Sequence, residues 1–256
     1  MAVTGAFHDA GYGFDVFGLS PPIVRRAAAL GAPLYERYFR VDSRGAEHIP
    51  LEGPAIIVAN HGGVLPVDAA MLCLDVLRNT PRIPRAIADH FVPRLPLVSA
   101  LFARLGVVSG TAANVRRLLE DGELVAIWPE GVAGPAKRFG LRYELQRWRV
   151  GFAEHAIRHR VPIIPAAIVG AEESWPLALR LPLRVFGSPY LPVPMSPLPL
   201  PARYFIRYGP PIVGEPTQVY RDAEDPSAVA ALAERARLAV AHLMSQTLAE
   251  RHGVFR

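Results

Sequence analysis

The sequence contains a single cysteine, Cys73, among its 256 residues. One cysteine cannot form an intramolecular disulfide, and it excludes a zinc site built from several cysteines. Cys73 lies within the apolar run of residues 69–74, which favours a small buried side chain over a reactive thiol. We therefore expect neither the fold nor the chemistry to depend on this thiol.

Long runs of one residue type are also missing. No stretch of about 18 uncharged apolar residues occurs, so we expect no membrane-spanning helix, and the N-terminus shows no signal-peptide pattern. The net charge is +5, but the sequence contains no run of about five basic residues. This balance disfavours a nucleic-acid partner and favours an anionic lipid surface or a phosphorylated substrate.

Hydrophobic residues make up 51% of the chain, which excludes a disordered protein. Short β-branched runs, typical of buried parallel strands, occur at residues 55–59, 124–128 and 162–169. Helical patterns occur at residues 69–78, 114–121 and 143–159, with a returning strand at 204–208 and a final helix at 226–252. The alternation predicts an α/β fold with a largely parallel sheet flanked by helices.

We expect one domain over residues 1–256, with an N-terminal amphipathic segment (1–50) and an α/β core (51–256). Residues 21–41 read as two helical pieces around Pro33, either an interfacial helix on anionic headgroups or an ordinary surface helix. An apolar, proline-rich insertion covers residues 175–201. Its prolines exclude a long helix and a central strand, and its many leucines favour contact with lipid or an acyl chain.

Ligands of such folds lie beyond the carboxyl ends of the strands, which places His61, Glu130 and Glu172 on one rim. Asp68 follows His61 after six intervening residues. Its carboxylate can accept the proton of one ring nitrogen and leave the other nitrogen free as a base. Gly62 and Gly63 permit the tight backbone path that this needs. The alternative is that Asp68 only caps the following helix.

Two further groups lie near the expected rim. Glu130 and Gly131 follow a strand, where the alternative is a β-turn with a surface glutamate. Lys137, Arg138 and Arg149 form a basic set, where the alternative is a solvated helix face.

In order along the chain, Asn60-His61, Asp68, Pro129-Glu130-Gly131 and the strand at 161–165 resemble the glycerolipid and lysophospholipid acyltransferases. The resemblance spans residues 41–212. That family carries a His-x4-Asp block, a later Pro-Glu-Gly block and an apolar Val-Pro-Ile-x-Pro strand. The gap here is six residues, with an added Gly-Gly, which is similar to the branch related to diacylglycerol acyltransferases.

The resemblance implies that His61, oriented by Asp68, deprotonates a hydroxyl that attacks an acyl thioester, either acyl-CoA or an acyl carrier protein. No cofactor or metal is expected, and backbone N–H groups near Gly131 would stabilise the oxyanion. A covalent acyl-enzyme is disfavoured because no Gly-x-Ser-x-Gly elbow occurs. The expected substrate-binding residues are Asn60, Gly62, Gly63, Glu130, Gly131, Lys137, Arg138 and Arg149.

Two departures from the family pattern concern the acceptor. The second block ends in Ser109-Gly110 without the usual arginine, and Val132-Ala133 stands where Thr-Arg often follows Glu-Gly. Both usual phosphate ligands are therefore missing, so a lysophosphatidate acceptor is not implied. Lys137, Arg138 or Arg149 could take their place.

Two other functions fit the same residues. A hydrolase could use the His-Asp pair to activate water on a thioester, and a non-enzymatic lipid-binding protein would fit the basic and apolar segments. For the transferase we expect a lipid or amphiphilic alcohol as acceptor, an anionic membrane surface as partner, and a cytoplasmic, peripheral location on the inner face of the membrane.

Overall fold

The computed structural model describes residues 7–92, 98–183, 190–214 and 220–255. Seven strands form the main sheet: β1 Asp42–Arg44, β2 Ala55–Ala59, β3 Arg85–Ala88, β4 Val108–Ser109, β5 Leu124–Ile127, β6 Ile163–Val169 and β9 Phe205–Tyr208. Their order is β1-β9-β6-β2-β5-β3-β4. Neighbouring strands are parallel except β6 with β9. The predicted α/β fold with a largely parallel sheet is confirmed.

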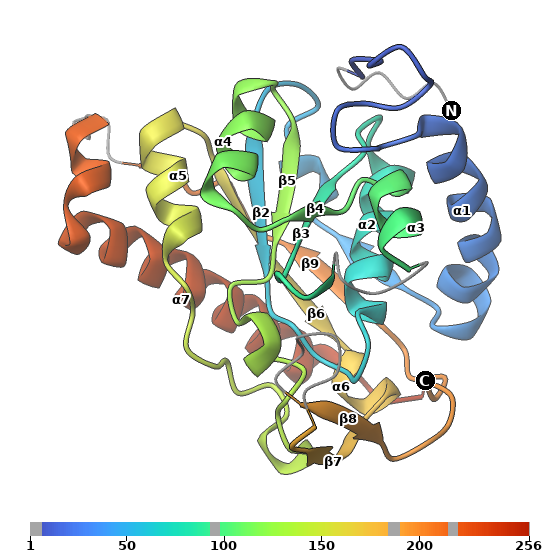
Figure 1. Cartoon of the computed structure of the whole chain (residues 1–256). Coiled ribbons are helices and arrows are strands. Elements are labelled where there is room, and N and C mark those ends of the chain that lie inside the picture. Colours follow the sequence, from blue (N-terminus) through green and yellow to red (C-terminus); the bar gives the residue numbers. More distant parts are fainter. Residues whose placement is uncertain (1–6, 93–97, 184–189, 215–219, 256) are drawn as a thin grey trace.

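Helices cover both faces of this sheet (Figure 1). They are α1 Pro21–Pro33, α2 Val67–Asn79, α3 Val98–Arg104, α4 Ala112–Glu120, α5 Gly151–His159, α6 Ala171–Ser174 and α7 Pro226–Glu250. Helix α2 packs on one face, and α4, α5 and α7 pack on the other. In the parts of the chain that are described, no helix combines the length and apolar character needed to cross a bilayer.

Strand β2 lies at the centre of the sheet and is buried on both faces. Ile56 and Val58 join the apolar cluster beneath α4, α5 and α7, whereas Ile57 and Ala59 join the cluster beneath α2. Burial of alternate side chains on opposite faces explains why this strand is an uninterrupted apolar run. The same burial fixes the position of the carboxyl end of β2, and the candidate site begins there.

The N-terminal segment forms two helical pieces, as expected. Helix α1 continues at Pro33 into a π-helical turn, Leu34–Tyr38. Val24 packs against Leu19 and Ile83, while Leu30 remains 80% exposed. One face of the segment therefore packs on the domain, and the other presents an apolar side chain to solvent.

The predicted helix over residues 143–159 is wrong in its first half, because α5 begins only at Gly151. The backbone N–H of Gln146 donates to the Glu130 carboxylate (2.9 Å), and that of Arg149 donates to the Pro129 carbonyl (3.0 Å). These bonds hold the chain in an irregular path past the carboxyl end of β5. The helical pattern is overridden by tertiary hydrogen bonds.

The proline-rich insertion forms a separate two-stranded sheet. Strand β7 Leu177–Leu181 pairs antiparallel with β8 Leu191–Pro194, and neither strand joins the main sheet. The expectation of no long helix and no central strand is confirmed for the described part of residues 175–201; residues 184–189 lie outside it.

Candidate active site

His61 and Asp68 face each other across the loop that joins β2 to α2. The Asp68 Oδ2 atom lies 2.6 Å from His61 Nδ1 and 3.0 Å from the backbone nitrogen of Gly62, while Oδ1 accepts the N–H of Ala69 (2.8 Å). The Asp68 side chain is fully buried. The N-cap of α2 is Pro66, so Asp68 lies inside the first turn and does not act as the N-cap. The predicted pairing is confirmed.

The second ring nitrogen of His61, Nε2, has no hydrogen-bond partner among the residues that the structure describes, and the side chain is 16% exposed. Burial pulls the pKa of His61 down. The charge and hydrogen bond of Asp68, helped by Glu130, outweigh burial and raise this pKa above its usual value. An imidazole held at Nδ1 and open at Nε2 has the geometry of a general base.

Glu130 fixes the backbone of His61 from the neighbouring strand β5. Its Oε1 accepts the N–H of His61 (3.0 Å), and its Oε2 accepts the N–H of Gln146 (2.9 Å). Only 2% of the residue is exposed. Glu130 is therefore not a surface residue of a β-turn but the acceptor that ties three loops together.

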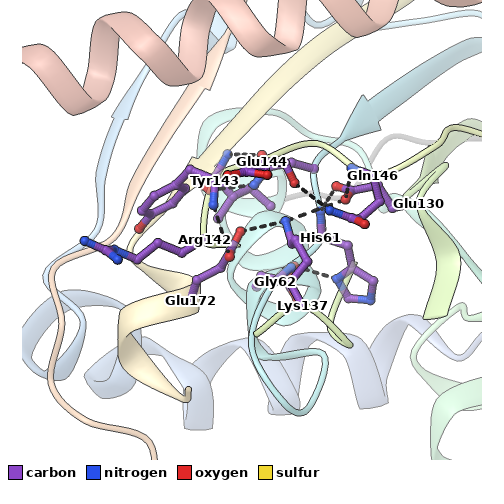
Figure 2. Close-up of polar contacts among 12 residues, drawn as sticks. His61, Gly62, Glu130, Lys137, Arg142, Tyr143, Glu144, Gln146 and Glu172 are labelled. Atoms are coloured by element: carbon purple, nitrogen blue, oxygen red, sulfur yellow. Dashed lines mark hydrogen bonds and ion pairs between the residues drawn. The ribbon is translucent and has the colours of Figure 1, made fainter. Parts of the chain in front are cut away.

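Lys137, the only lysine in the sequence, is buried between two glutamates. Its Nζ lies 2.8 Å from Glu172 Oε1 and 3.6 Å from Glu130 Oε2, as Figure 2 shows. Glu172 also accepts the backbone N–H of Tyr143 (3.2 Å). The prediction that His61, Glu130 and Glu172 share one rim is confirmed. The charge of Lys137 is offset by two carboxylates, and its role towards a substrate stays a prediction.

Two glycines allow the His61 loop to lie close to its neighbours. A Cβ atom on Gly62 would lie 2.4 Å from Glu172 Cγ, and one on Gly134 would lie 2.7 Å from the His61 carbonyl oxygen. Gly63 adopts a φ of +85°, which favours glycine. Larger residues at Gly62 or Gly134 would displace the loop that carries His61.

The N–H of Gly131 is already used inside the turn, because it donates to the Trp128 carbonyl (2.9 Å). An oxyanion donor among the other backbone N–H groups near Gly131 stays a prediction. The indole nitrogen of Trp128 is buried and has no hydrogen-bond partner in the described part of the chain. Its ring centroid lies 5.8 Å from that of His61, so this donor is close to the base.

The other predicted site residues, Asn60, Arg138 and Arg149, do not bond to the His61 or Asp68 side chains in the described part of the chain. The Asn60 side chain bonds the backbone N–H and carbonyl of Ile168 (2.7 and 2.9 Å), so it joins β2 to β6 and is only 1% exposed. Arg149 pairs with Asp89 (2.8 Å) and its side chain is 64% exposed, and Arg138 is also exposed. Both arginines are at the surface, where an anionic group could reach them.

Glu172 was predicted to lie on the rim but not to be a substrate-binding residue, and Tyr143 and Gln146 were not predicted. The position of Glu172 directly after β6 was a usable signal, because this is the rim where ligands bind. Tyr143 and Gln146 contact Glu172 and Glu130 through backbone N–H groups, which no residue type reveals. The Tyr143 hydroxyl also donates to Glu173 and accepts the N–H of Gly170. Burial raises the pKa of the Cys73 thiol to about 12, consistent with a non-reactive cysteine.

Glu172 is expected to make stability depend on pH. Burial raises its pKa to about 7 even though Lys137 lowers it, so the folded state holds this proton more tightly than the unfolded state, where the usual value is 4.5. The stabilisation is complete below pH 4.5 and is lost as the pH rises through about 7. At about 1.4 kcal/mol per pKa unit, the loss is at most about 3 kcal/mol.

This dependence can be measured by denaturant unfolding between about pH 5 and pH 8. The wild type should lose stability as the pH rises, and Glu172→Gln should show a flatter curve because its side chain does not titrate. Equal slopes for the two proteins would contradict the assignment to Glu172.

The fold and the site together define an α/β protein with a His-Asp pair at the carboxyl end of its central parallel strand. A model of the acyltransferase family matches residues 40–169, which is half of the chain and contains both members of the pair. The chain belongs to this family of glycerolipid acyltransferases and is a lipid acyltransferase.

Two relatives are similar in sequence. Rv0502 of Mycobacterium tuberculosis, an uncharacterized protein, is 37% identical over 263 residues, covering 95% of this chain and 72% of that protein. A human protein named DGAT1/2-independent enzyme synthesizing storage lipids is 35% identical over 121 residues, covering 47% of this chain and 37% of that protein.

Among solved structures, the 1-acyl-sn-glycerophosphate acyltransferase PlsC of Thermotoga maritima has a similar fold. The TM-score is 0.53 at 17% identity, over 83% of this chain and 79% of that one. This likeness concerns the fold, and it agrees with the parallel sheet and flanking helices described above.

Proposed function

We propose that this acyltransferase moves a fatty acyl group from an acyl thioester directly to the hydroxyl of a lipid-like acceptor, with His61 as the general base. The observation that carries the proposal is the 2.6 Å contact of Asp68 with His61 Nδ1, which leaves Nε2 open. Nε2 takes the hydroxyl proton as the oxygen attacks the thioester carbonyl. The ester bond forms, the carbon–sulfur bond breaks, and the departing thiolate takes the proton from His61.

The roles of the surrounding residues follow from their contacts. Asp68 selects the tautomer with its proton on Nδ1 and stabilises the imidazolium that forms during transfer. Glu130 positions the His61 backbone through the 3.0 Å bond to its N–H. The unpartnered indole N–H of Trp128 is a candidate donor to the bound ester or thioester carbonyl.

A neutral acceptor is the better fit to this site. The two arginines that hold the acceptor phosphate in much of the family are missing, and Lys137 is paired with two buried carboxylates. The name of the human relative, which refers to the synthesis of storage lipids, supports the same choice. The exposed Arg138 and Arg149 remain the candidates for an anionic part of the donor.

The transferase is tested by thioester turnover with and without acceptor. Purified protein receives acyl-CoA, or acyl carrier protein loaded with the same chain, alone and with a monoacylglycerol, a diacylglycerol or lysophosphatidate. We expect a glycerolipid acceptor to raise the rate of thiol release at least tenfold. The acyl ester should form in an amount equal to that of the released thiol. Thiol release that is indifferent to every acceptor would instead show a thioesterase that uses the same pair.

A further inference from the structure

The β7–β8 hairpin exposes an unusually apolar surface. Leu179 and Leu181 on β7 pair with Val193 and Leu191 on β8, so these side chains share one face. The leucines and methionine of the hairpin and the segment after it are 36–71% exposed: Leu179, Leu181, Leu183, Leu191, Met195 and Leu198. An apolar surface this continuous marks a contact with a protein or a membrane.

The hairpin is attached directly to the loops of the active site. The N–H of Val64, in the loop that carries His61, donates to the carbonyl of Trp175 at the base of the hairpin (3.2 Å). Trp175 and Leu177 line a small pocket together with Gly63, Phe139 and Glu172. The base of the hairpin therefore contacts both the loop that carries His61 and the residues around Glu172.

Two site loops extend this apolar surface. Leu65, three residues before Asp68, is 49% exposed, and Phe139 and Leu141, which follow Lys137, are 39% and 44% exposed. Figure 1 shows the hairpin at the same end of the molecule as α6, beyond the carboxyl ends of β2 and β6. Leu65 and Phe139 thus lie on site loops that contact the base of the hairpin.

The charges beside this surface are of one sign. Between Glu173 and Glu215 the sequence contains no acidic residue, and none occurs between Glu130 and Glu144. Arg138, Arg142 and Arg180 lie within these stretches and are exposed. Leucines flanked by arginines match the interface of a bilayer with anionic headgroups, where apolar side chains enter the acyl boundary and guanidinium groups meet the phosphates.

We propose that the β7–β8 hairpin, with Leu65, Phe139 and Leu141, docks the enzyme on an anionic lipid bilayer so that the His61 site opens onto the membrane. The inference rests on the proposed function only in taking a lipid as substrate. The hairpin lies at headgroup depth, because a two-stranded sheet keeps unpaired backbone groups that the hydrocarbon core excludes. Pro192 and Pro194 reduce that penalty, since neither has an N–H to leave unpaired.

A second apolar surface lies on the N-terminal segment, where Leu30 and Leu34 are 80% and 47% exposed. This segment also exposes Glu36, which pairs with Arg78 (2.7 Å), so its charges are mixed. It contains fewer exposed leucines than the hairpin and packs on α2, away from the pocket beside Glu172. The hairpin is the better match to a bilayer that must deliver substrate.

Vesicle flotation of the intact protein, without any substrate, tests the proposal. The probes are vesicles of phosphatidylcholine and vesicles in which about a third of the lipid is phosphatidylglycerol. We expect the wild type to float with the anionic vesicles, and Leu179→Asp/Leu181→Asp to bind at least tenfold more weakly, because two apolar contacts become charged. Arg180→Ser should reduce the preference for anionic vesicles while retaining part of the binding.

Leu238→Asp on α7 is the matched control, because Leu238 is 53% exposed and lies on another element. It should bind as the wild type does, and thermal unfolding should be alike for all variants. The inactive His61→Ala protein should still float, which separates docking from the proposed chemistry. The proposal is overturned if the wild type floats with neither vesicle, if the hairpin variant binds normally, or if only Leu30→Asp weakens binding.

Discussion

Replacing His61 with alanine is expected to lower acyl transfer by about 10²- to 10⁴-fold, which is the usual contribution of a general base. Among the described residues the His61 side chain has one polar partner, Asp68, and the hydrogen bond from the His61 backbone N–H to Glu130 is kept in the variant. The fold should therefore persist, and the loss should appear in the rate of ester formation. Initial rates at saturating thioester and acceptor measure it.

A second variant, Asp68→Asn, keeps His61 and removes only the negative charge of its partner. The Asp68 charge contributes to the raised pKa of His61, so its removal should lower that pKa and move the acid limb of the pH–rate profile to lower pH. Activity should fall as well, because an amide can stabilise the wrong tautomer. Wild-type rates in a correctly folded His61→Ala protein would exclude His61 as the base.

Replacing Lys137 with methionine is expected to destabilise the fold by about 3–5 kcal/mol near neutral pH, because the ammonium between two buried carboxylates is lost. Lys137 lowers the pKa of Glu172, so in the variant this pKa should rise above about 7 and Glu172 should hold a proton near neutral pH. The destabilisation should therefore grow as the pH rises above about 7. Denaturant unfolding of wild type and variant at several pH values measures the difference.

Two companion variants test whether loss of the buried ion pairs causes the destabilisation of Lys137→Met. In Lys137→Met/Glu172→Gln one of the two uncompensated charges is also removed, so this double variant should be more stable than Lys137→Met alone. Arg138→Met removes an equivalent charge at the neighbouring exposed position and should change stability little. If Lys137→Met were as stable as Arg138→Met at pH 7, the buried ion pairs would contribute nothing measurable.

Much of the fold was predictable because its signals are local. The strands β2, β5 and β6 are short apolar runs rich in β-branched residues, which is typical of strands buried on both faces. The last helix was predicted at residues 226–252 and spans Pro226–Glu250. The short strands β1, β3 and β4 were missed, since two to four residues contain too little pattern.

The site residues also fall into two groups: those that the local sequence pairs, and those that only the fold brings together. His61 and Asp68 are seven residues apart, on a loop and in the first turn of the helix that follows it, so chain connectivity brings them close. Residue type and spacing are enough to pair them. Glu130 is 69 residues from His61, and Glu172 is 35 residues from Lys137. Contacts over such distances depend on the order and register of the strands, which a single sequence does not state.

By itself, then, the sequence determined an α/β protein with a His-Asp pair placed where a parallel strand ends, together with the ordered blocks of a glycerolipid acyltransferase. Only the tertiary structure decided that Glu130 holds the His61 backbone, that the sole lysine lies buried between two carboxylates, and that the base of the proline-rich hairpin contacts the loop that carries His61. The physical reason is that burial and charge pairing are properties of packed neighbours. A lysine in a polar stretch looks solvated until the sheet brings Glu130 and Glu172 to either side of it.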